Sequence, residues 1–260
     1  MDTSFDVNQI KGLLLDLDGV LYVGDKAIDG AAETIQYLRL KHLPLRFCTN
    51  TTILSNKSLL EKLGRMGLSI EPHELYGAIS AAVSYLRRYG RPRCFFLVTD
   101  DPGQDFAEFP EDDKDPEFII LGDVGKQWDY ELMQKVFHLV VRGARMVALH
   151  KGRYWETSEG LRMDVGAFVA GLEYVTGQTA TLIGKPSRDF FELAVKDMRL
   201  RPSEVAMVGD DINSDIGGAQ QAGMKAILVE TGKYRAELAA RAGITPDLIL
   251  DSVTALREIF

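Results

Sequence analysis

Short apolar runs alternate with amphipathic stretches at the start of the chain. Residues 12–18 and 43–50 are predicted strands, because their apolar side chains are nearly contiguous. Residues 31–41 and 55–66 instead carry apolar side chains at the spacing of one helix face. The pattern therefore predicts strand, helix, strand and helix in that order.

The same alternation returns in the last third of the chain. Predicted strands alternate there with predicted helices at residues 180–186, 187–198, 204–211, 212–222, 224–232 and 235–242. Such alternation favours a parallel sheet that is covered by helices on both faces. We therefore expect both ends of the chain to contribute to one α/β sheet.

Between these two blocks lies a stretch with an alternation of its own. The runs CFFLVTD, EFIILGD and RMVALHKG resemble strands, and Met133 and Val136 lie at helical spacing. The economical interpretation is a second α/β domain inserted into the first, with turn-forming residues at both joins. We predict a core domain of residues 1–76 and 180–260 and an inserted domain of residues 77–179.

The amino-acid composition of the chain favours some classes of protein and argues against others. With 260 residues and 46% hydrophobic content, the chain is long enough to bury one large or two modest cores. No apolar run would span a bilayer and no signal peptide is recognisable, so we expect a cytoplasmic protein. Cys48 and Cys94 lie in apolar segments and are predicted to be buried free thiols. The acidic balance, 38 acidic against 30 basic residues, argues against a nucleic-acid partner.

Polar, chemically reactive side chains follow the predicted strands of the outer domain. Carboxyl ends of parallel strands meet at one edge of a sheet, where ligands bind. Taken singly, each group has an ordinary interpretation as a turn, a helix cap or a surface lysine. Successive strand ends with complementary charge instead indicate one functional site. The residues concerned are Asp16, Asp18, Thr49, Asn50, Thr51, Lys185, Asp210, Asp211 and Asp215.

The concentration of carboxylates predicts a metal ion. Carboxylates at one sheet edge repel one another and raise one another's pKa values unless a cation lies among them. Magnesium suits this position, because it prefers oxygen ligands, uses one or two carboxylates and keeps waters that a phosphate oxygen can replace. Asp16 and Asp210 are the expected ligands. The acidic segment at residues 100–117 is interpreted separately, as a solvated surface loop.

Four short motifs resemble those of the haloacid dehalogenase (HAD) superfamily of phosphohydrolases. They are DLDGV at residues 16–20, CTN at 48–50, GKP at 184–186 and GDDINSD at 209–215. The long insert between the second and third motifs is similar to the C2-type cap of the subgroup that contains NagD-like phosphatases. The stretches LHKGRYW, FVAGLEYVTG and TGKYR also resemble this subgroup. The resemblance implies a Rossmann-like core with a parallel sheet and an inserted α/β cap.

The resemblance also implies catalytic and metal-binding roles. Asp16 would attack phosphorus and form an aspartyl-phosphate, and Asp18 would protonate the leaving oxygen and then activate water. Asp16, the backbone carbonyl of Asp18, and Asp210 would bind Mg²⁺. Asp211 would either touch the hydration shell of the metal or cap the following helix.

Further roles concern the phosphoryl group of the substrate. By the same resemblance, Thr49, Asn50 and Thr51 would hold phosphate oxygens with hydroxyl and backbone N–H donors. Lys185 would neutralise charge on the nucleophile and on the transferring group. Asp215 would orient Lys185 or a metal-bound water.

The inserted domain is expected to select the leaving group, because the motifs recognise only a phosphoryl group. His150, Lys151 and Arg153 form a basic cluster, and His150 and Lys151 are candidate substrate-binding residues. The alternative interpretation is a solvated turn with Tyr154 and Trp155 packed into the cap.

The predicted function is Mg²⁺-dependent hydrolysis of a small phosphorylated metabolite, either a phosphate monoester, a phosphoamidate or a pyrophosphate. One alternative is a phosphotransferase that passes the same intermediate to another acceptor. A second is a non-catalytic phospho-acceptor or binding protein, which would gain nothing from a general base at Asp18. No membrane partner is expected. C2-capped relatives often dimerise through the cap, and the apolar run at residues 95–97 fits either such an interface or an interior strand.

Overall fold

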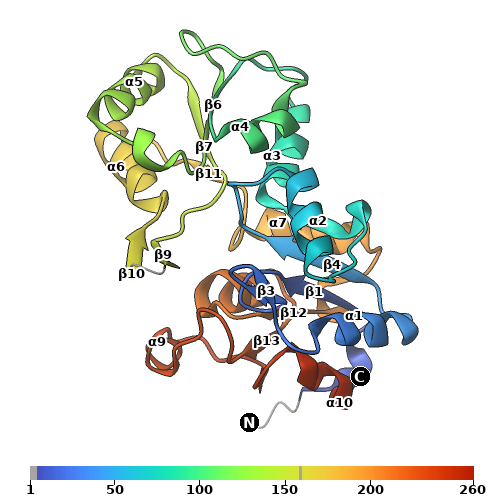
Figure 1. The fold of residues 1–260 in the computed structure, drawn as a ribbon. Coiled ribbons are helices and arrows are strands. Elements are labelled where there is room, and N and C mark those ends of the chain that lie inside the picture. The colour runs from blue at the N-terminus through green and yellow to red at the C-terminus, as the bar shows by residue number, and fades with distance from the viewer. Residues whose placement is uncertain (1–4, 158–159) are drawn as a thin grey trace. The chain divides into compact units, whose positions relative to one another are not determined.

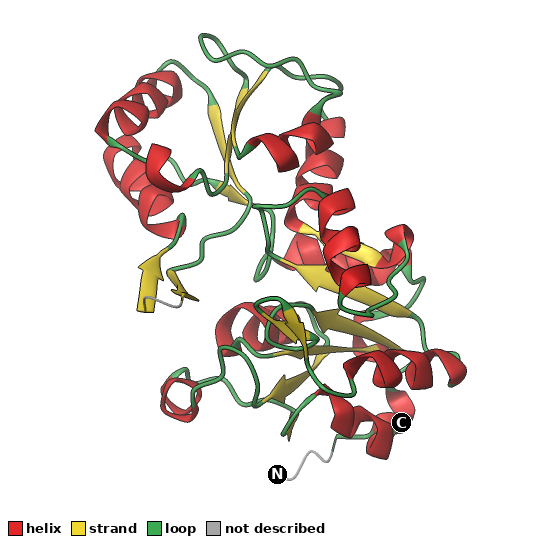
Figure 2. Ribbon diagram, in the orientation of Figure 1, coloured by secondary structure: helices red, strands yellow, loops and turns green. Residues whose placement is uncertain are grey.

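The computed structural model describes residues 5–157 and 160–260 and divides the chain into two compact units (Figure 1). The core unit comprises the chain up to Thr49 and residues 60–76 and 185–260. The inserted unit comprises residues 50–59 and 77–184. Each unit contains a sheet flanked by helices, so the fold is α/β as the sequence predicts (Figure 2). The exact domain boundaries given above stay a prediction.

Six strands form the sheet of the core unit, in the order β14-β13-β12-β1-β4-β5. They are β1 (Gly12–Asp16), β4 (Leu45–Thr49), β5 (Leu75–Gly77), β12 (Val205–Gly209), β13 (Lys225–Val229) and β14 (Leu248–Leu250). Every residue of β1 and β12 is buried, as expected of a parallel sheet covered on both faces. Strands from both ends of the chain share this sheet, blue and orange in Figure 1, which confirms the prediction from the alternation.

The helices of the core unit follow the predicted pattern closely. In α1 (Ala31–Leu40), the residues Ala31, Ile35 and Leu38 are buried on one face. The segment expected as one helix at residues 212–222 instead begins as a π-helical stretch. The other helical elements are η1 (Val7–Gln9), η2 (Pro72–Glu74), α7 (Arg188–Asp197), η5 (Pro202–Glu204), η6 (Ile212–Gly217), α8 (Gly218–Gln221), α9 (Ala236–Arg241), η7 (Val253–Ala255) and α10 (Leu256–Ile259). The helix α2 (Asn56–Arg65) begins in the inserted unit and ends in the core unit.

The order of strands in the core sheet fixes where a ligand can bind. β1 pairs in parallel with β12 on one side and with β4 on the other, so the chain runs outward from β1 in both directions. The carboxyl end of β1 is therefore a topological switch point, where loops diverge and leave a crevice. Asp16 ends β1, Thr49 ends β4 and Asp210 follows β12. The topology thus brings these residues to one sheet edge. A short hairpin, β2 (Tyr22–Val23) and β3 (Lys26–Ala27), follows β1.

The inserted unit has a four-stranded sheet in the order β11-β8-β7-β6. Its apolar core includes Ile119, Val136, Val169 and Leu172. The apolar run at residues 95–97 lies in a strand that pairs with β7, and Phe95 and Leu97 are buried. The elements are α3 (Ala78–Arg87), β6 (Cys94–Leu97), α4 (Asp100–Gly103), η3 (Gln104–Phe106), β7 (Phe118–Leu121), η4 (Gly125–Gln127), α5 (Tyr130–Val141), β8 (Arg145–Ala148), β9 (Tyr154–Thr157), β10 (Gly160–Met163), α6 (Gly166–Thr176) and β11 (Thr181–Leu182).

The strand expected at residues 180–186 does not join the core sheet, so that expectation is wrong. It forms the two-residue β11, which pairs with β8 through Thr181 and Leu182. The N–H groups of Ile183 and Gly184 continue the contact by donating to carbonyls of the β8 end, each at 2.9 Å. These bonds hold the segment along β8 up to the boundary with the core unit at Lys185.

The acidic segment at residues 100–117 is a solvated loop only in part. Its first half forms α4 and η3, and Phe106 and Phe109 are buried with 1% and 4% of their surface exposed. The Asp101 carboxylate accepts the N–H of Ser55 at 2.7 Å, and the Asp105 carboxylate accepts the N–H of Asn56 at 2.9 Å. These acidic side chains therefore cap the start of α2, and the expectation of a loop is wrong for this half.

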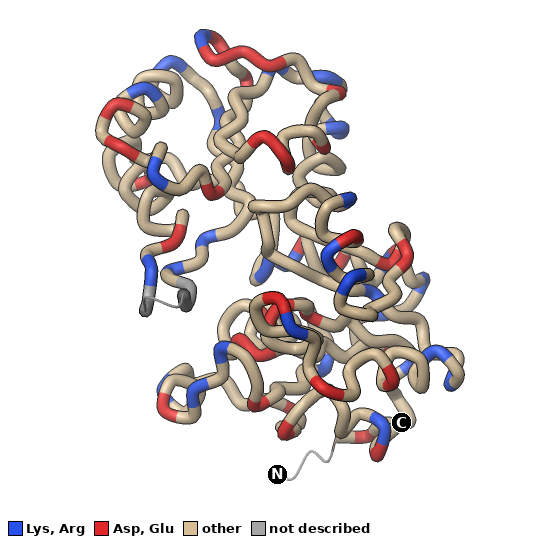
Figure 3. The backbone as a smooth tube through the Cα atoms, viewed as in Figure 1, with Lys and Arg blue, Asp and Glu red and all other residues tan. Residues whose placement is uncertain are grey.

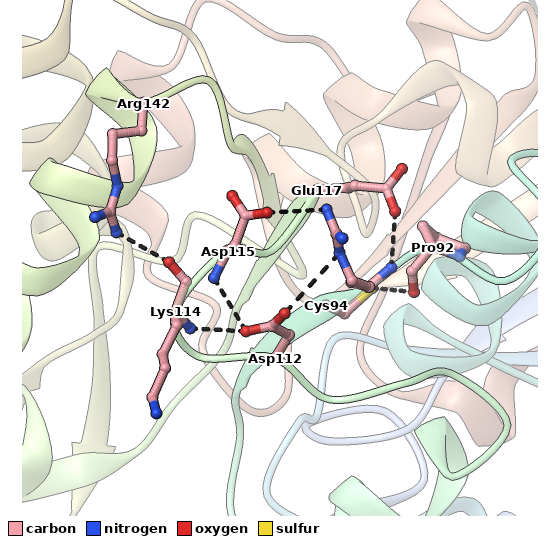
Figure 4. Close-up of polar contacts among 8 residues, drawn as sticks. Pro92, Cys94, Asp112, Lys114, Asp115, Glu117 and Arg142 are labelled. Carbon is pink, nitrogen blue, oxygen red and sulfur yellow. Dashed lines mark hydrogen bonds and ion pairs between the residues drawn. The ribbon is translucent and has the colours of Figure 1, made fainter.

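The second half of the acidic segment is a loop rich in acidic residues (Figure 3), and hydrogen bonds and ion pairs stabilise it (Figure 4). Asp112 Oδ1 accepts the N–H groups of Lys114 and Asp115 at 2.9 and 3.0 Å. Arg93 lies 3.2 Å from the Asp115 carboxylate, and Arg142 donates to the Lys114 carbonyl at 3.0 Å. Paired charges thus account for this loop without a ligand.

Both cysteines are buried free thiols, as the sequence predicts. Within the described part of the chain, no helix is long and apolar enough to cross a membrane.

Burial in the inserted unit predicts the effect of truncating its core. Ile119 of β7 has none of its surface exposed, and Ile119→Ala should lower the free energy of unfolding by about 2–5 kcal/mol, because it leaves a cavity. Val141→Ala on α5 is the control, since Val141 is 63% exposed and its loss should change the value by about 0.5 kcal/mol or less. Urea unfolding followed by circular dichroism measures both. Equal effects would contradict the assignment of the core.

Candidate active site

Three buried carboxylates converge at the switch point of the core sheet. Asp16 ends β1, Asp210 follows β12, and Asp215 lies in η6. One carboxylate oxygen from each lies within 4.8 Å of the others. Their exposed fractions are 7%, 2% and 0%, so solvent screens their mutual repulsion poorly.

Lys185 lies between two of these carboxylates. Its Nζ is 2.7 Å from Asp16 Oδ1 and 2.7 Å from Asp215 Oδ1, and only 3% of the side chain is exposed. Burial alone would lower the pKa of Lys185, but the two carboxylates raise it above its ordinary value. The lysine is therefore a charged ammonium that holds Asp16 and Asp215 together.

The remaining charge fits a divalent cation. When all three carboxylates are ionised, they and the Lys185 ammonium carry a net charge of −2. Burial first, and then the charge of Asp16, raises the pKa of Asp210, and burial likewise raises the pKa of Asp215. Asp210 Oδ1 is buried without a hydrogen-bond partner in the described chain, which is costly unless a ligand binds there. The cluster could therefore hold a hard cation, which prefers carboxylate oxygens.

Two contacts orient the side chain of Asp16. Asp16 Oδ1 accepts the N–H of Leu17 at 2.8 Å and also faces Lys185. In the described chain both contacts fall on Oδ1, so Oδ2 is the oxygen available for other chemistry. The structure thus presents one carboxylate oxygen of Asp16 and holds the other.

Asp18 lies beside this cluster with its side chain reaching solvent. The surrounding protein raises the pKa of Asp18 by desolvation, the nearby Lys233 lowers it, and Asp16 raises it further, with a net upward shift. Gly19 follows with a φ of +87°, a conformation that favours glycine. A carboxyl group with a raised pKa and access to solvent is suited to exchanging protons.

The segment after β4 crosses the boundary between the two units. Thr49 is buried at the end of β4 in the core unit, whereas Asn50 and Thr51 belong to the inserted unit. The roles of Thr49, Asn50 and Thr51 in holding phosphate stay predictions. Cys48 precedes them, and burial raises the pKa of its thiol to about 12, which keeps it neutral.

Asp211 has a structural role in the same region. Its Oδ1 accepts the N–H groups of Asn213 and Ser214, both at 2.9 Å, and so caps η6. Its own N–H donates to Asp215 Oδ2 at 3.2 Å. Of the two roles considered from the sequence, the structure shows the cap.

His150 is buried in the inserted unit, beyond the end of β8. The N–H of Gly152 lies 3.2 Å from His150 Nδ1. His150 Nε2 lies 3.4 Å from the hydroxyl of Thr52, and Nδ1 lies 3.7 Å from an Asp164 oxygen. The imidazole thus contacts the segment that continues from Asn50 and Thr51.

The other residues of the basic cluster differ in their surroundings. Lys151 Nζ lies 2.8 Å from both carboxylate oxygens of Glu173, so its charge is paired. Tyr154 is 47% exposed and is not packed into a core, contrary to that alternative. The side chain of Trp155 lies outside the described residues. Substrate binding by His150 and Lys151 stays a prediction.

A turn after β13 is part of the site and was not recognised from the sequence as such. The Lys233 N–H donates to Asp210 Oδ2 at 2.6 Å, and the Thr231 hydroxyl donates to the Gly19 carbonyl. Asp16, Asp210 and Asp18 raise the pKa of Lys233, although burial alone would lower it. The sequence did contain a signal for this turn, because TGK follows a buried strand of the same sheet. The other site residues were predicted because they too follow such strands.

Comparisons with known proteins agree with this site. Residues 13–109 match the haloacid dehalogenase-like hydrolase family, and residues 182–256 match a HAD-hydrolase-like family. The chain is 38% identical to human haloacid dehalogenase-like hydrolase domain-containing protein 2, covering 94% of this chain and 93% of that protein. It is 36% identical to phospholysine phosphohistidine inorganic pyrophosphate phosphatase of Danio rerio, covering 98% and 96%.

A solved structure shares the whole fold. The 4-nitrophenylphosphatase of Thermotoga maritima superposes with a TM-score of 0.89 at 28% identity, covering 97% of this chain and 98% of that one. Matches of this extent include all four motifs and the inserted unit. The chain therefore belongs to the haloacid dehalogenase-like hydrolases and is a hydrolase of the phosphatase type.

Proposed function

We propose that this chain is a Mg²⁺-dependent phosphatase that hydrolyses a small phosphorylated metabolite through an aspartyl-phosphate on Asp16. The observation that carries the proposal is the buried Lys185 ammonium, 2.7 Å from Asp16 and from Asp215, beside a third carboxylate on Asp210. This arrangement supplies a nucleophile, a fixed positive charge and oxygen ligands at one place. Relatives named as phosphatases support the same reaction class.

In the first step, Asp16 Oδ2 attacks phosphorus while Oδ1 stays held by Leu17 and Lys185. The bond between phosphorus and the leaving atom breaks, and Asp18 donates its proton to that atom. The raised pKa of Asp18 favours the protonated form that this step needs. Lys185 offsets the negative charge on the transferring group.

In the second step, water attacks the phosphorus of the aspartyl-phosphate. Asp18, now ionised, accepts a proton from this water, and the bond between phosphorus and Asp16 Oδ2 breaks. Inorganic phosphate leaves and both carboxylates return to their starting states. The pair of aspartates two residues apart therefore performs covalent catalysis and proton transfer in turn.

The expected metal ligands are Asp16, the backbone carbonyl of Asp18, and Asp210. The unpartnered Oδ1 of Asp210 supports this assignment, since no other group in the described chain satisfies it. Bound Mg²⁺ would neutralise the carboxylates and stabilise negative charge on phosphate oxygens. Thr49, Asn50 and Thr51 would hold the phosphate itself.

The inserted unit is proposed to select the substrate. His150 contacts Thr52, which adjoins the predicted phosphate-binding segment, and is the stronger candidate for contacting the leaving group. Lys151 would first have to leave Glu173. The substrate class remains a small phosphate monoester, phosphoamidate or pyrophosphate.

One prediction from this mechanism concerns the nucleophile. Asp16→Asn should lower the rate of phosphate release at least about 10³-fold, because the amide cannot form the covalent intermediate. Phosphate release is measured on p-nitrophenyl phosphate, phosphoramidate and pyrophosphate, with and without Mg²⁺. Asp251→Asn is the control, since Asp251 is exposed in the same unit and should leave the rate unchanged. Undiminished turnover by Asp16→Asn would refute the mechanism, and phosphate release that requires an added acceptor would indicate a phosphotransferase.

A second prediction concerns pH and metal binding. The folded pKa values of Asp210 and Asp215 are raised above 3.8, so the folded metal-free protein holds these protons more tightly than the unfolded chain. These two groups therefore stabilise the metal-free fold at low pH, and this stabilisation is lost as the pH rises through their raised pKa values. Mg²⁺ competes with the protons, so the increase in Tm on adding Mg²⁺ should be larger near about pH 8 than near about pH 5.

Thermal unfolding of the native protein and Asp210→Asn, with and without Mg²⁺, measures this dependence. The variant should lose most of the Mg²⁺-induced increase in Tm at the higher pH. An increase in Tm that is equal at both pH values, or larger in acid, would count against the proposed site.

A further inference from the structure

The turn formed by Thr231, Gly232 and Lys233 touches two parts of the candidate active site at once. We propose that this turn, here called the TGK turn, is a positioning clamp that sets the Asp210 carboxylate and the backbone at Gly19 for a divalent cation. The inference rests on the metal site in the proposed function and goes further, because it assigns a role to residues outside the four motifs.

The first contact of the clamp is with Asp210. The N–H of Lys233 donates to Asp210 Oδ2 at 2.6 Å, while Oδ1 of the same carboxylate has no hydrogen-bond partner in the described chain. One oxygen is therefore fixed by a backbone donor and the other is left for a ligand. The donor belongs to the main chain, so the contact does not depend on the lysine side chain.

The second contact is with the turn that follows Asp18. The Thr231 hydroxyl donates to the Gly19 carbonyl, and the Gly19 N–H donates to the Tyr22 carbonyl at 2.7 Å. These bonds hold Gly19 from both sides. The peptide that joins Asp18 to Gly19 is thereby fixed, and this peptide contains the Asp18 carbonyl expected to bind the cation.

Close packing of two glycines makes both contacts possible. Gly19 and Gly232 have φ values of +87° and +60°. A Cβ added to Gly232 would lie 2.2 Å from Asp210 Oδ2 and 2.3 Å from the Gly19 Cα. A Cβ added to Gly19 would lie 1.9 Å from the same Asp210 oxygen. Any side chain at either position would therefore displace the carboxylate or separate the two turns.

The consequence is a metal site that is largely set before the cation binds. Groups that orient metal ligands typically change metal affinity by about 10- to 100-fold when they are lost. The clamp should act through affinity for the cation, and it needs no contact between the TGK turn and the substrate. Metal binding without substrate is therefore the readout that separates this role from catalysis.

The test compares Gly232→Ala with Gly243→Ala by titrating each full-length protein with Mg²⁺ in a calorimeter. Gly243 has a φ of +68° and no atom within 4 Å of an added Cβ, so it matches the backbone strain at Gly232 without the clash. Gly232→Ala should weaken Mg²⁺ binding by about 10-fold or more, and Gly243→Ala should not change it. Equal affinities would overturn the clamp.

Two further substitutions keep the proposal testable if Gly232→Ala does not fold. Thr231→Val removes the hydroxyl that holds Gly19 and should weaken Mg²⁺ binding, while Thr231→Ser should restore it. Lys233→Ala keeps the N–H and should bind Mg²⁺ within about twofold of the native protein or more tightly, because a nearby positive charge is lost. A loss in Lys233→Ala as large as in Thr231→Val would assign the role to the ammonium and overturn the proposal.

The outcomes also separate this inference from the proposed function. A native protein that binds no Mg²⁺ overturns both. A native protein that binds Mg²⁺ and needs Asp16 for turnover, with unchanged affinity in Gly232→Ala and Thr231→Val, overturns the clamp alone.

Discussion

The crowding of negative charge at the carboxyl end of β1 is the constraint on which the rest of the site depends. Three carboxylates lie within 4.8 Å of one another, and the Lys185 ammonium bridges two of them. Removing one member of a buried ion pair typically costs about 3–5 kcal/mol, because it leaves a charge without a partner. Removing Lys185 would therefore destabilise this edge of the fold, in addition to any loss of its proposed role in the chemistry. Loss of activity on its removal would not distinguish a structural role of Lys185 from its proposed catalytic role.

Much of this arrangement could be predicted from the sequence, because it follows from local patterns and one topological rule. The contiguous apolar residues of β1 and β12 identify buried strands, and parallel strands present their carboxyl ends at one edge. The polar residues that end these runs must then meet. Asp16 and Asp210 were expected to lie together for this reason, and the structure places them together. The type of side chain and the rule for parallel strands were sufficient for this prediction, and no knowledge of individual contacts was needed.

The parts that could not be predicted depend on tertiary partners. The two residues of β11 are too few to specify a sheet, and only hydrogen bonds to β8 decide which sheet they join. From the sequence, the acidic residues Asp101 and Asp105 resemble part of a solvated charge run. In the structure Phe106 and Phe109 are buried, and the two carboxylates accept N–H groups at the start of α2. The position of the TGK turn after a buried strand of the core sheet was visible in the sequence, but its contact with Asp210 was not, because a backbone N–H makes it.

Both backbone and side-chain contacts hold the three carboxylates in place. Repulsion would drive three ionised carboxylates apart, and each has a partner that opposes this. Lys185 holds Asp16 and Asp215, and the N–H of Lys233 holds Asp210. The Lys185 ammonium contacts two of the three carboxylates, and Asp210 Oδ1 is left without a hydrogen-bond partner in the described chain. The glycine pair at 19 and 232 lets a main-chain donor reach the third carboxylate, so the geometry of the site is a property of the sheet edge and its turns as much as of the reactive side chains.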